Sequence, residues 1–406
     1  MSSSVVNPRL KKALSLELDN LANAVIALAE VNSGSYNISG VNECVERLAH
    51  QLEPLEPDTI EIIQSGPSPV VDQKGFQVEY PVGKTLRARK RPDAPFQVCM
   101  FGHLDTVFDA EHSFQTVTRN GTRLNGPGVA DCKGGLVVAT EVLRYLDQTD
   151  WGSEVGWEFL VLPDEEVGSV GSKPFLAEAA RRCDIGLGFE PALISGDIVV
   201  ARKGILNLYA VVRGVASHAG RSRHEGRSAI RGLAALTGVL ETYNEQPGIT
   251  LNCGWIEGGG ALNTVPDFAI GGYDVRVSTM EDREWIHAKV AASANAIAEI
   301  HDIEVETFWP SERPPKTRTP ELERLVEDVC ESAAEIGEVV AAEDSGGASD
   351  GNDLASYGLT NIDNLGICGG GIHSDQEFAD VASIPVRAEI TARVIRRAKE
   401  RHQRHS

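Results

Sequence analysis

The sequence predicts an α/β protein in which a small two-layer α+β domain is inserted into a larger domain with a parallel sheet flanked by helices. The chain has 406 residues, which is enough for two domains. In its first half, short apolar runs alternate with segments of helical periodicity, the order that joins parallel strands. After Pro191 the expected order is strand–helix–strand–strand–helix–strand, which is typical of a small α+β unit. A proline-rich stretch at 310–320 is expected to be the linker that returns to the larger domain.

The elements of the larger domain are expected in the following order. Residues 8–52 carry apolar side chains at three- and four-residue spacing, which predicts helices interrupted by a loop at 32–40. Residues 66–95 are rich in proline, glycine and basic side chains and predict a loop and an edge strand. Short apolar runs predict strands at 60–64, 96–102, 157–162 and 185–189. Helical spacing predicts helices at 134–146, 173–182, 321–336 and 383–401.

The inserted domain is expected to span residues 201–315, which leaves 1–200 and 316–406 for the larger domain. Alternation of apolar and polar residues predicts antiparallel strands at 198–201 and 206–212. Further strands are expected at 250–257, 268–278 and 303–308, and helices at 228–243 and 284–301.

Composition excludes several classes of function. The chain carries 38 Lys and Arg against 59 Asp and Glu, a formal net charge of −21, so we expect neither a general nucleic-acid surface nor attraction to anionic membranes. No run of about 18 apolar residues predicts a transmembrane span. Seven scattered cysteines without a CxxC pair argue against a disulfide framework and indicate a cytoplasmic protein.

Histidine and carboxylate side chains recur at or just beyond the ends of expected strands, or in glycine loops. The five segments are GHLDT at 102–106, GPGVADCKGG at 126–135, PDEEVGS at 163–169, GFEP at 188–191 and GGGIHSDQE at 369–377. Ligands of open α/β sheets bind at this edge. Each segment alone has a structural explanation: Asp131 suits a helix N-cap, and PDEE suits a surface loop. Together they supply two histidines and at least three carboxylates, a donor set for two divalent ions.

Three further motifs, ASHAG, N-x-x-P with DVR, and GGASDGND, join these segments in an ordered series. The series GHLDTV, GPGVADCKGG, LPDEEVGSVGS, FEP, ASHAG, N-x-x-P with DVR, GGASDGND and HSDQE resembles the M20 co-catalytic zinc peptidases and acylases, most of all their glutamate carboxypeptidase (carboxypeptidase G2-like) branch. The resemblance runs from about residue 18 to the C-terminal helix. It implies a catalytic domain with a mixed, largely parallel sheet, interrupted by a two-layer, ferredoxin-like lid domain through which family members usually form homodimers.

The resemblance also implies two Zn²⁺ ions per subunit, with Co²⁺ or Mn²⁺ as substitutes. His103, Asp131 and Glu190 would hold one ion, and Asp131, Glu166 and His373 would hold the other. Asp131 would therefore bridge the two ions.

Three residues would be catalytic by the same resemblance. Glu165 would be the general base that moves a proton from the attacking water to the leaving nitrogen. Asp105 would orient His103, as a carboxylate two residues from a ligand can do in an extended segment. His218 would stabilise the oxyanion, commonly from the neighbouring subunit.

Substrate contacts are expected from Asn263 and Arg276, and from a pocket wall that includes Gly347 and Ser349. An arginine at this position grips a free carboxylate bidentately. The expected reaction is hydrolysis of the amide bond of an N-acyl amino acid or of the C-terminal residue of a small peptide or conjugate, with glutamate as the first candidate product. An aminoacylase, deacetylase or dipeptidase of the same family is the alternative, and a catalytically inactive metal-binding scaffold is a remote one.

Overall fold

The larger domain is built on a six-stranded mixed sheet with the strand order β1-β4-β8-β5-β9-β18. These strands are β1 (Thr59–Gln64), β4 (Lys84–Lys90), β8 (Val155–Leu162), β5 (Phe96–His103), β9 (Ile185–Gly188) and β18 (Asn361–Ile362). Strands β8, β5, β9 and β18 run parallel, whereas β1 and β4 are antiparallel to their neighbours. The computed structural model describes residues 8–405, with side chains from 17 to 404. The mixed, largely parallel sheet expected from the sequence is confirmed.

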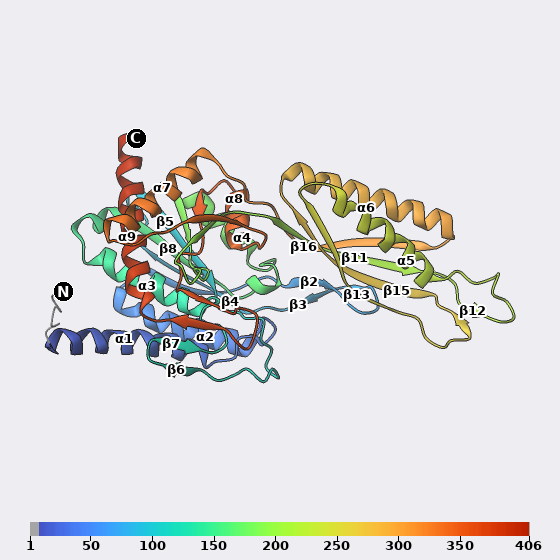
Figure 1. Cartoon of the computed structure of the whole chain (residues 1–406), viewed down its shortest axis with the longest axis horizontal. Helices are drawn as coiled ribbons and strands as arrows, with labels where there is room; N and C mark the ends of the chain where they lie inside the picture. Colours follow the sequence, from blue (N-terminus) through green and yellow to red (C-terminus); the bar gives the residue numbers. More distant parts are fainter. Residues whose placement is uncertain (1–7, 406) are drawn as a thin grey trace, which may run out of the picture.

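Helices cover both faces of this sheet (Figure 1). One face packs against α1 (Pro8–Ala29), α2 (Ile38–Leu52), α3 (Lys133–Asp147), α7 (Pro320–Glu335) and α9 (Ser383–His405). The other face packs against α4 (Lys173–Arg182) and α8 (Asp350–Ser356). Neighbouring residues of β5 separate accordingly, because Met100 belongs to the first core and Phe101 to the second. Burial on both faces explains why β8 is apolar apart from Glu158, which pairs with Arg182.

The inserted domain is a four-stranded antiparallel sheet in the order β13-β15-β11-β16. Its strands are β11 (Gly204–Arg213), β13 (Ile249–Gly258), β15 (Phe268–Val277) and β16 (Glu304–Arg313). Helices α5 (Ala229–Glu241) and α6 (Met280–His301) lie together on one face (Figure 1). Ser228 and Thr279 cap these two helices through their side chains. A small two-stranded ladder, β12 (Ser217–His218) with β14 (Thr264–Val265), lies at the far end of the domain.

Short ladders complete the larger domain. β19 (Gly369–Gly370), β20 (Phe378–Asp380), β7 (Arg123–Asn125) and β6 (Thr118–Asn120) form one small sheet. β10 (Ile198–Arg202) pairs with β17 (Ala342–Ser345). No helix within the described residues has the length and apolar character needed to cross a membrane.

A hairpin of the larger domain, β2 (Ser68–Val71) and β3 (Gln77–Tyr80), reaches the face of the inserted sheet that α5 and α6 leave open. Val71 packs there against Val211 and Ile270. Arg213 donates to the carbonyl of Lys74 at 3.1 Å. The hairpin therefore ties the two domains together away from the linkers.

Three sequence expectations are corrected. Within 66–95, β4 is an interior strand instead of an edge strand, since it pairs with both β1 and β8. Strand β10 pairs in parallel with β17 of the larger domain, so 198–201 is not the antiparallel partner of β11. The expected linker at 310–320 is shorter, because β16 continues to Arg313. Pro310 is accommodated because β16 is an edge strand with a register shift between Asn207 and Tyr209 of its partner.

Candidate metal centre and adjoining cleft

Three parallel strands and two loops bring acidic and imidazole side chains to one edge of the sheet. β5 ends at His103, β8 is followed by Glu166, and β9 is followed by Glu190. Asp131 stands two residues before the first residue of α3, and His373 lies in the loop between β19 and β20. All five metal-ligand candidates named from the sequence therefore meet at the edge where α/β sheets bind ligands.

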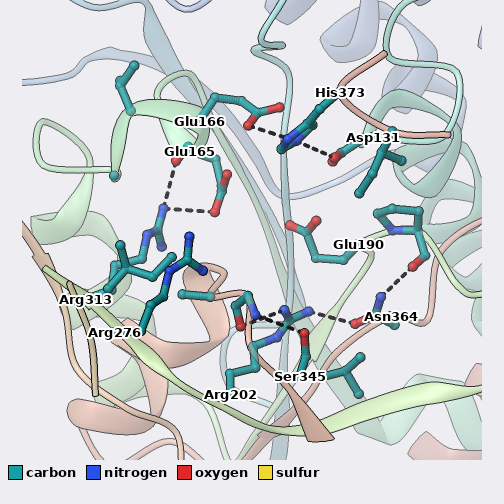
Figure 2. Close-up of a pocket in the computed structure, with 18 of the residues that line it drawn as sticks. Asp131, Glu165, Glu166, Glu190, Arg202, Arg276, Arg313, Ser345, Asn364 and His373 are labelled. Carbon is teal, nitrogen blue, oxygen red and sulfur yellow. Dashed lines mark hydrogen bonds and ion pairs between the residues drawn. The ribbon is translucent and has the colours of Figure 1, made fainter. Parts of the chain in front are cut away.

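The carboxylate of Asp131 stands between two imidazoles. Its Oδ1 lies 3.1 Å from Nε2 of His103, and its Oδ2 lies 3.3 Å from Nε2 of His373. Nε2 of His103 is 3.6 Å from Oε1 of Glu190, and Nε2 of His373 is 3.4 Å from Oε2 of Glu166 (Figure 2). The side chains thus form two groups of three that share Asp131.

This arrangement is compatible with the binding of divalent ions. Two ligands of a tetrahedral zinc, each at 2.0–2.1 Å, stand about 3.3 Å apart, which is close to all four distances given above. Oε1 of Glu190 is buried and has no hydrogen-bond partner among the described residues, as expected for an atom placed to contact a cation. Imidazole and carboxylate donors suit zinc and related ions.

Cys132 also lies within 4.8 Å of the ligand atoms of His103 and Glu190. Its thiol donates to the carbonyl of Phe189 at 3.0 Å. Because Cys132 is fully buried and its thiol is used in this contact, we interpret it as a packing residue.

Asp105 organises the loop that follows β8. Its carboxylate accepts the backbone N–H of Glu165 at 3.0 Å, that of Glu166 at 3.1 Å, and the hydroxyl of Ser35 at 2.7 Å. Nδ1 of His103 lies 3.0 Å from the carbonyl oxygen of Asp105 and 3.4 Å from its carboxylate. Asp105 therefore contacts His103 chiefly through its backbone, while its carboxylate fixes the two glutamates.

Glu377 supports the centre, although the sequence assigned no role to it. The buried carboxylate of Glu377 accepts the backbone N–H groups of Gly128, Ala130 and Asp131 at 2.9–3.0 Å. It therefore holds the loop that delivers Asp131. Its place in HSDQE, four residues after His373, was the available signal.

Glu165 faces the cleft beside a buried arginine. Nη2 of Arg313 lies 2.9 Å from Oε1 of Glu165 and also donates to the Glu165 carbonyl at 3.0 Å. Burial raises the pKa of the Glu165 carboxyl, and the charge of Arg313 opposes that rise. A carboxyl with a raised pKa is suited to accept and return a proton near neutral pH.

The electrostatics of the centre reflect close carboxylate–imidazole pairs. Burial lowers the pKa of His103, but Glu190, Asp105 and Asp131 outweigh burial and raise it overall. Hydrogen bonds to Asp131 and Glu166 raise the pKa of His373 to about 10. Both imidazoles are therefore surrounded by carboxylates, and the same negative charge would favour a bound cation.

A cleft of about 650 Å³ opens from the centre and lies between the two domains. Arg276 and Arg313 stand across the cleft from His373 and Asp131 (Figure 2). Arg276 donates through Nε and Nη2 to Asp274 at 2.8 and 3.0 Å, and through Nη1 to the carbonyl of Gly346 at 2.9 Å. Three of its five N–H groups are used in these contacts, which leaves two for a ligand in the cleft.

The structure places the other two expected substrate-contact residues, Gly347 and Ser349, in different surroundings. Gly347 lines the cleft, so its expected contact with a substrate stays a prediction. The expected substrate contact of Ser349 is corrected. Its buried hydroxyl donates to Asp363 at 2.5 Å and accepts the N–H of Gly351 at the start of α8, so it is not available to a substrate. Arg202, which the sequence did not single out, lines the cleft and pairs with Asp363 at 3.1 Å.

His218 and Asn263 lie together at the far end of the inserted domain. The N–H of Ala219 donates to the carbonyl of Asn263 at 2.8 Å, next to the β12–β14 ladder. In Figure 1 this ladder lies at the end of the inserted domain that points away from β5 and β8, the strands that lead to the ligand candidates. His218 is exposed and is not among the described residues that line the cleft.

Comparisons with known proteins agree with the site. The family model described as Peptidase family M20/M25/M40 matches residues 99–397. Carboxypeptidase G2 of Pseudomonas sp. (strain RS-16) is 29% identical over 327 residues, 77% of each chain. Succinyl-diaminopimelate desuccinylase of Gluconobacter oxydans (strain 621H) is 24% identical over 315 residues, 71% of this chain and 77% of that one. The crystal structure of an M20 family metallo-carboxypeptidase, Sso-CP2 from Sulfolobus solfataricus, matches with a TM-score of 0.72 at 17% identity, covering 93% of this chain and 98% of that one, which concerns the fold.

Proposed function

Because the chain belongs to peptidase family M20/M25/M40 and is a hydrolytic metallopeptidase, we propose that it hydrolyses the amide bond of N-acyl amino acids or of the C-terminal residues of small peptides and conjugates. The family expected from the ordered motifs is thereby confirmed. The observation that carries the proposal is the continuous cleft between the clustered ligand candidates and Arg276. Such a cleft holds a scissile amide at one end and a free carboxylate at the other. Glutamate is the proposed first choice of released amino acid, which the similarity to carboxypeptidase G2 supports.

The proposed cofactor is a pair of zinc ions held by His103, Asp131, Glu190, Glu166 and His373. When bound, the ions supply Lewis acidity and make a water molecule more acidic. The remaining steps belong to the chain. Glu165 takes a proton from the attacking water and returns it to the leaving amine. Arg276 holds the substrate carboxylate with its two remaining N–H groups.

His218 and Asn263 are proposed to act on the substrate of a second copy of this chain. Both lie at the exposed end of the inserted domain, where they can reach another subunit but not the centre of their own. The proposal therefore includes a homodimer formed through the inserted domain. All seven cysteines are unpaired, which suits a reducing compartment, and a cytoplasmic location stays part of the proposal.

The test is a hydrolysis screen of N-acyl and peptidyl amino acids with zinc, cobalt and manganese. We expect release of free amino acid, fastest with glutamate conjugates. Glu165→Gln should retain its metal by elemental analysis and lose turnover by several orders of magnitude, since it keeps the shape of the side chain but cannot take up the proton. Near-normal turnover in that variant would refute the role of Glu165, and no hydrolysis by the wild-type protein with any metal would refute the proposed function.

A further inference from the structure

A second cavity, of about 610 Å³, adjoins the metal centre. It shares Glu166 and Val167 with the cleft, and no other described residue lines both. The two cavities are therefore adjacent at Glu166, a proposed metal ligand, and at Val167. A substrate whose carboxylate lies in the cleft against Arg276, and whose amide lies at the centre, has this second cavity available for the group on the acyl side.

The wall of this cavity is formed by two loops that are packed tightly together. The amide of Asn32 donates to the carbonyls of Phe108 and Asp109 at 3.1 and 2.9 Å. At Gly34 a Cβ atom would stand 2.5 Å from the carbonyl oxygen of Phe108, so only glycine permits this approach. The cavity is thus preformed and does not depend on a chance arrangement of surface side chains.

Apolar surface is exposed inside the cavity. Tyr36 is 52% exposed and Val107 is 44% exposed, and both are among the lining residues. The ring of Tyr36 is supported by Tyr80 of the hairpin, with ring centroids 5.7 Å apart. Exposed aromatic and aliphatic side chains that converge in a preformed cavity are typical of a subsite for an apolar group.

The charge of this cavity differs from that of the cleft. Asp109 and Glu111 are exposed at its edge, and no Lys, Arg or His is among its described lining residues. The cleft carries charges of both signs, because three arginines and five carboxylates line it, but Arg276 keeps two N–H groups for an anionic ligand and the second cavity offers no such donor. A substrate with one carboxylate is therefore oriented with that carboxylate in the cleft and an uncharged group in the second cavity.

We propose that this second cavity is the acyl-side subsite, that Tyr36 and Val107 bind an uncharged acyl group there, and that Asp109 and Glu111 disfavour an acyl group that ends in a carboxylate. The inference rests on the proposed function and specifies its substrate class. By this inference the chain should disfavour N-succinyl substrates, unlike the relative that is named a succinyl-diaminopimelate desuccinylase.

The test compares two substrates of equal shape, N-succinyl-L-glutamate and N-succinamoyl-L-glutamate, in which a terminal amide replaces the terminal carboxylate. The full-length, zinc-supplied protein should show a kcat/KM at least about fivefold higher for the succinamoyl compound, the effect of one unit charge at about 4 Å in water. The double variant Asp109→Asn/Glu111→Gln should bring this ratio close to one. The matched control Glu281→Gln/Glu284→Gln removes the same charge from the exposed side of α6 and should leave the ratio unchanged.

The apolar wall is tested with N-benzoyl- and N-acetyl-L-glutamate. Tyr36→Ala should lower the preference for the benzoyl compound roughly tenfold, because it removes the aromatic surface that covers the ring. Equal kcat/KM values for the succinyl and succinamoyl compounds, in a protein that does cleave glutamate conjugates, would overturn the inference and leave the proposed function standing. Failure to cleave any of the four conjugates would overturn both.

Discussion

Nη2 of Arg313 lies 2.9 Å from Oε1 of Glu165, although the two residues are 148 positions apart in the chain. Arg313 is the last residue of β16, where the inserted domain returns to the larger one. The same guanidinium pairs with Asp350 at 2.9 Å and Asp353 at 3.1 Å. The position of the inserted domain is thereby coupled to the residue proposed as general base.

Substitution of Arg313 should change turnover more than substrate binding. In Arg313→Lys one charge remains, but the ammonium group cannot reach all the partners of the guanidinium fork, so Glu165 loses its fixed position. We expect kcat to fall between about 10-fold and 100-fold with little change in KM, the effect of misplacing a reacting group by about 1 Å. Steady-state kinetics measure the changes in kcat and KM separately.

Arg313→Met should instead destabilise the protein by on the order of 3–5 kcal/mol, since it leaves buried carboxylates without their partner. Arg283→Lys is the matched control for Arg313→Lys. Arg283, on α6, pairs with Glu312, the neighbour of Arg313 on β16, but not with Glu165. An Arg313→Lys variant that raises KM and leaves kcat intact would contradict the positioning role.

Metal content should separate the two groups of ligand candidates. His373→Ala removes a ligand from only one group and should bind one zinc ion per chain fewer than the wild-type protein. Asp131→Ala removes the carboxylate that both groups share and should lose nearly all zinc. Elemental analysis of the purified proteins measures the number of zinc ions per chain. Unchanged zinc in Asp131→Ala would refute the bridging role.

Glu377 should control metal affinity without touching the metal. Glu377→Gln replaces one acceptor oxygen by an amide donor that faces a backbone N–H group, so the loop carrying Asp131 is held less well. Loss of such an outer partner typically weakens metal binding between about 10-fold and 100-fold. Competition with a zinc chelator measures the dissociation constant. Asp375→Asn, an exposed acid in the same loop, is the control and should bind zinc as the wild-type protein does.

Much of the fold and the ligand cluster could be predicted because each depends on local patterns. The apolar run before His103 predicts a buried strand, and strands of a parallel sheet deliver their ends to one edge. The motif series supplied the same five ligand candidates that the structure brings together. The motif HSDQE marked Glu377 but not its role, and nothing marked Arg313, because their partners are backbone groups or side chains that only the tertiary structure places beside them.

In 66–95 one edge strand was expected, whereas the structure has a hairpin and the interior strand β4. In β4, Leu86 and Ala88 are buried on either side of Arg87, an alternation that is typical of a strand with one polar face and does not reveal that the strand is interior. Arg87 is accommodated because it pairs with Glu61 and Glu178, from two other elements. The hairpin that contains Val71 has its apolar partners in the inserted domain, more than a hundred residues later in the chain. Neither pairing leaves a signal in the local sequence.

Lys316 should make stability depend on pH in the alkaline range. Burial lowers its pKa to about 8 against the opposing effect of Asp363, whose Oδ2 is 3.9 Å from Nζ. Between about pH 8 and 10.5 the unfolded chain binds a proton that the folded protein has released, so the wild-type free energy of unfolding rises with pH across this window. The rise in unfolding free energy should approach about 3 kcal/mol, because the pKa of Lys316 differs by about 2.5 units between the unfolded and folded states. Below about pH 8 both states are protonated, and the contribution becomes constant.

The Lys316→Met variant has no group to titrate at this position and should lack the rise. The quantity to compare is the difference in unfolding free energy between wild type and variant, measured by urea denaturation at pH 7.5 and pH 10, because other groups that titrate in this range cancel in the difference. Lys74→Met, which removes an exposed lysine on the β2–β3 hairpin, should show no such change with pH. Parallel pH curves for the wild type and Lys316→Met would mean that the buried ammonium group keeps its proton in the folded protein, and would contradict the prediction.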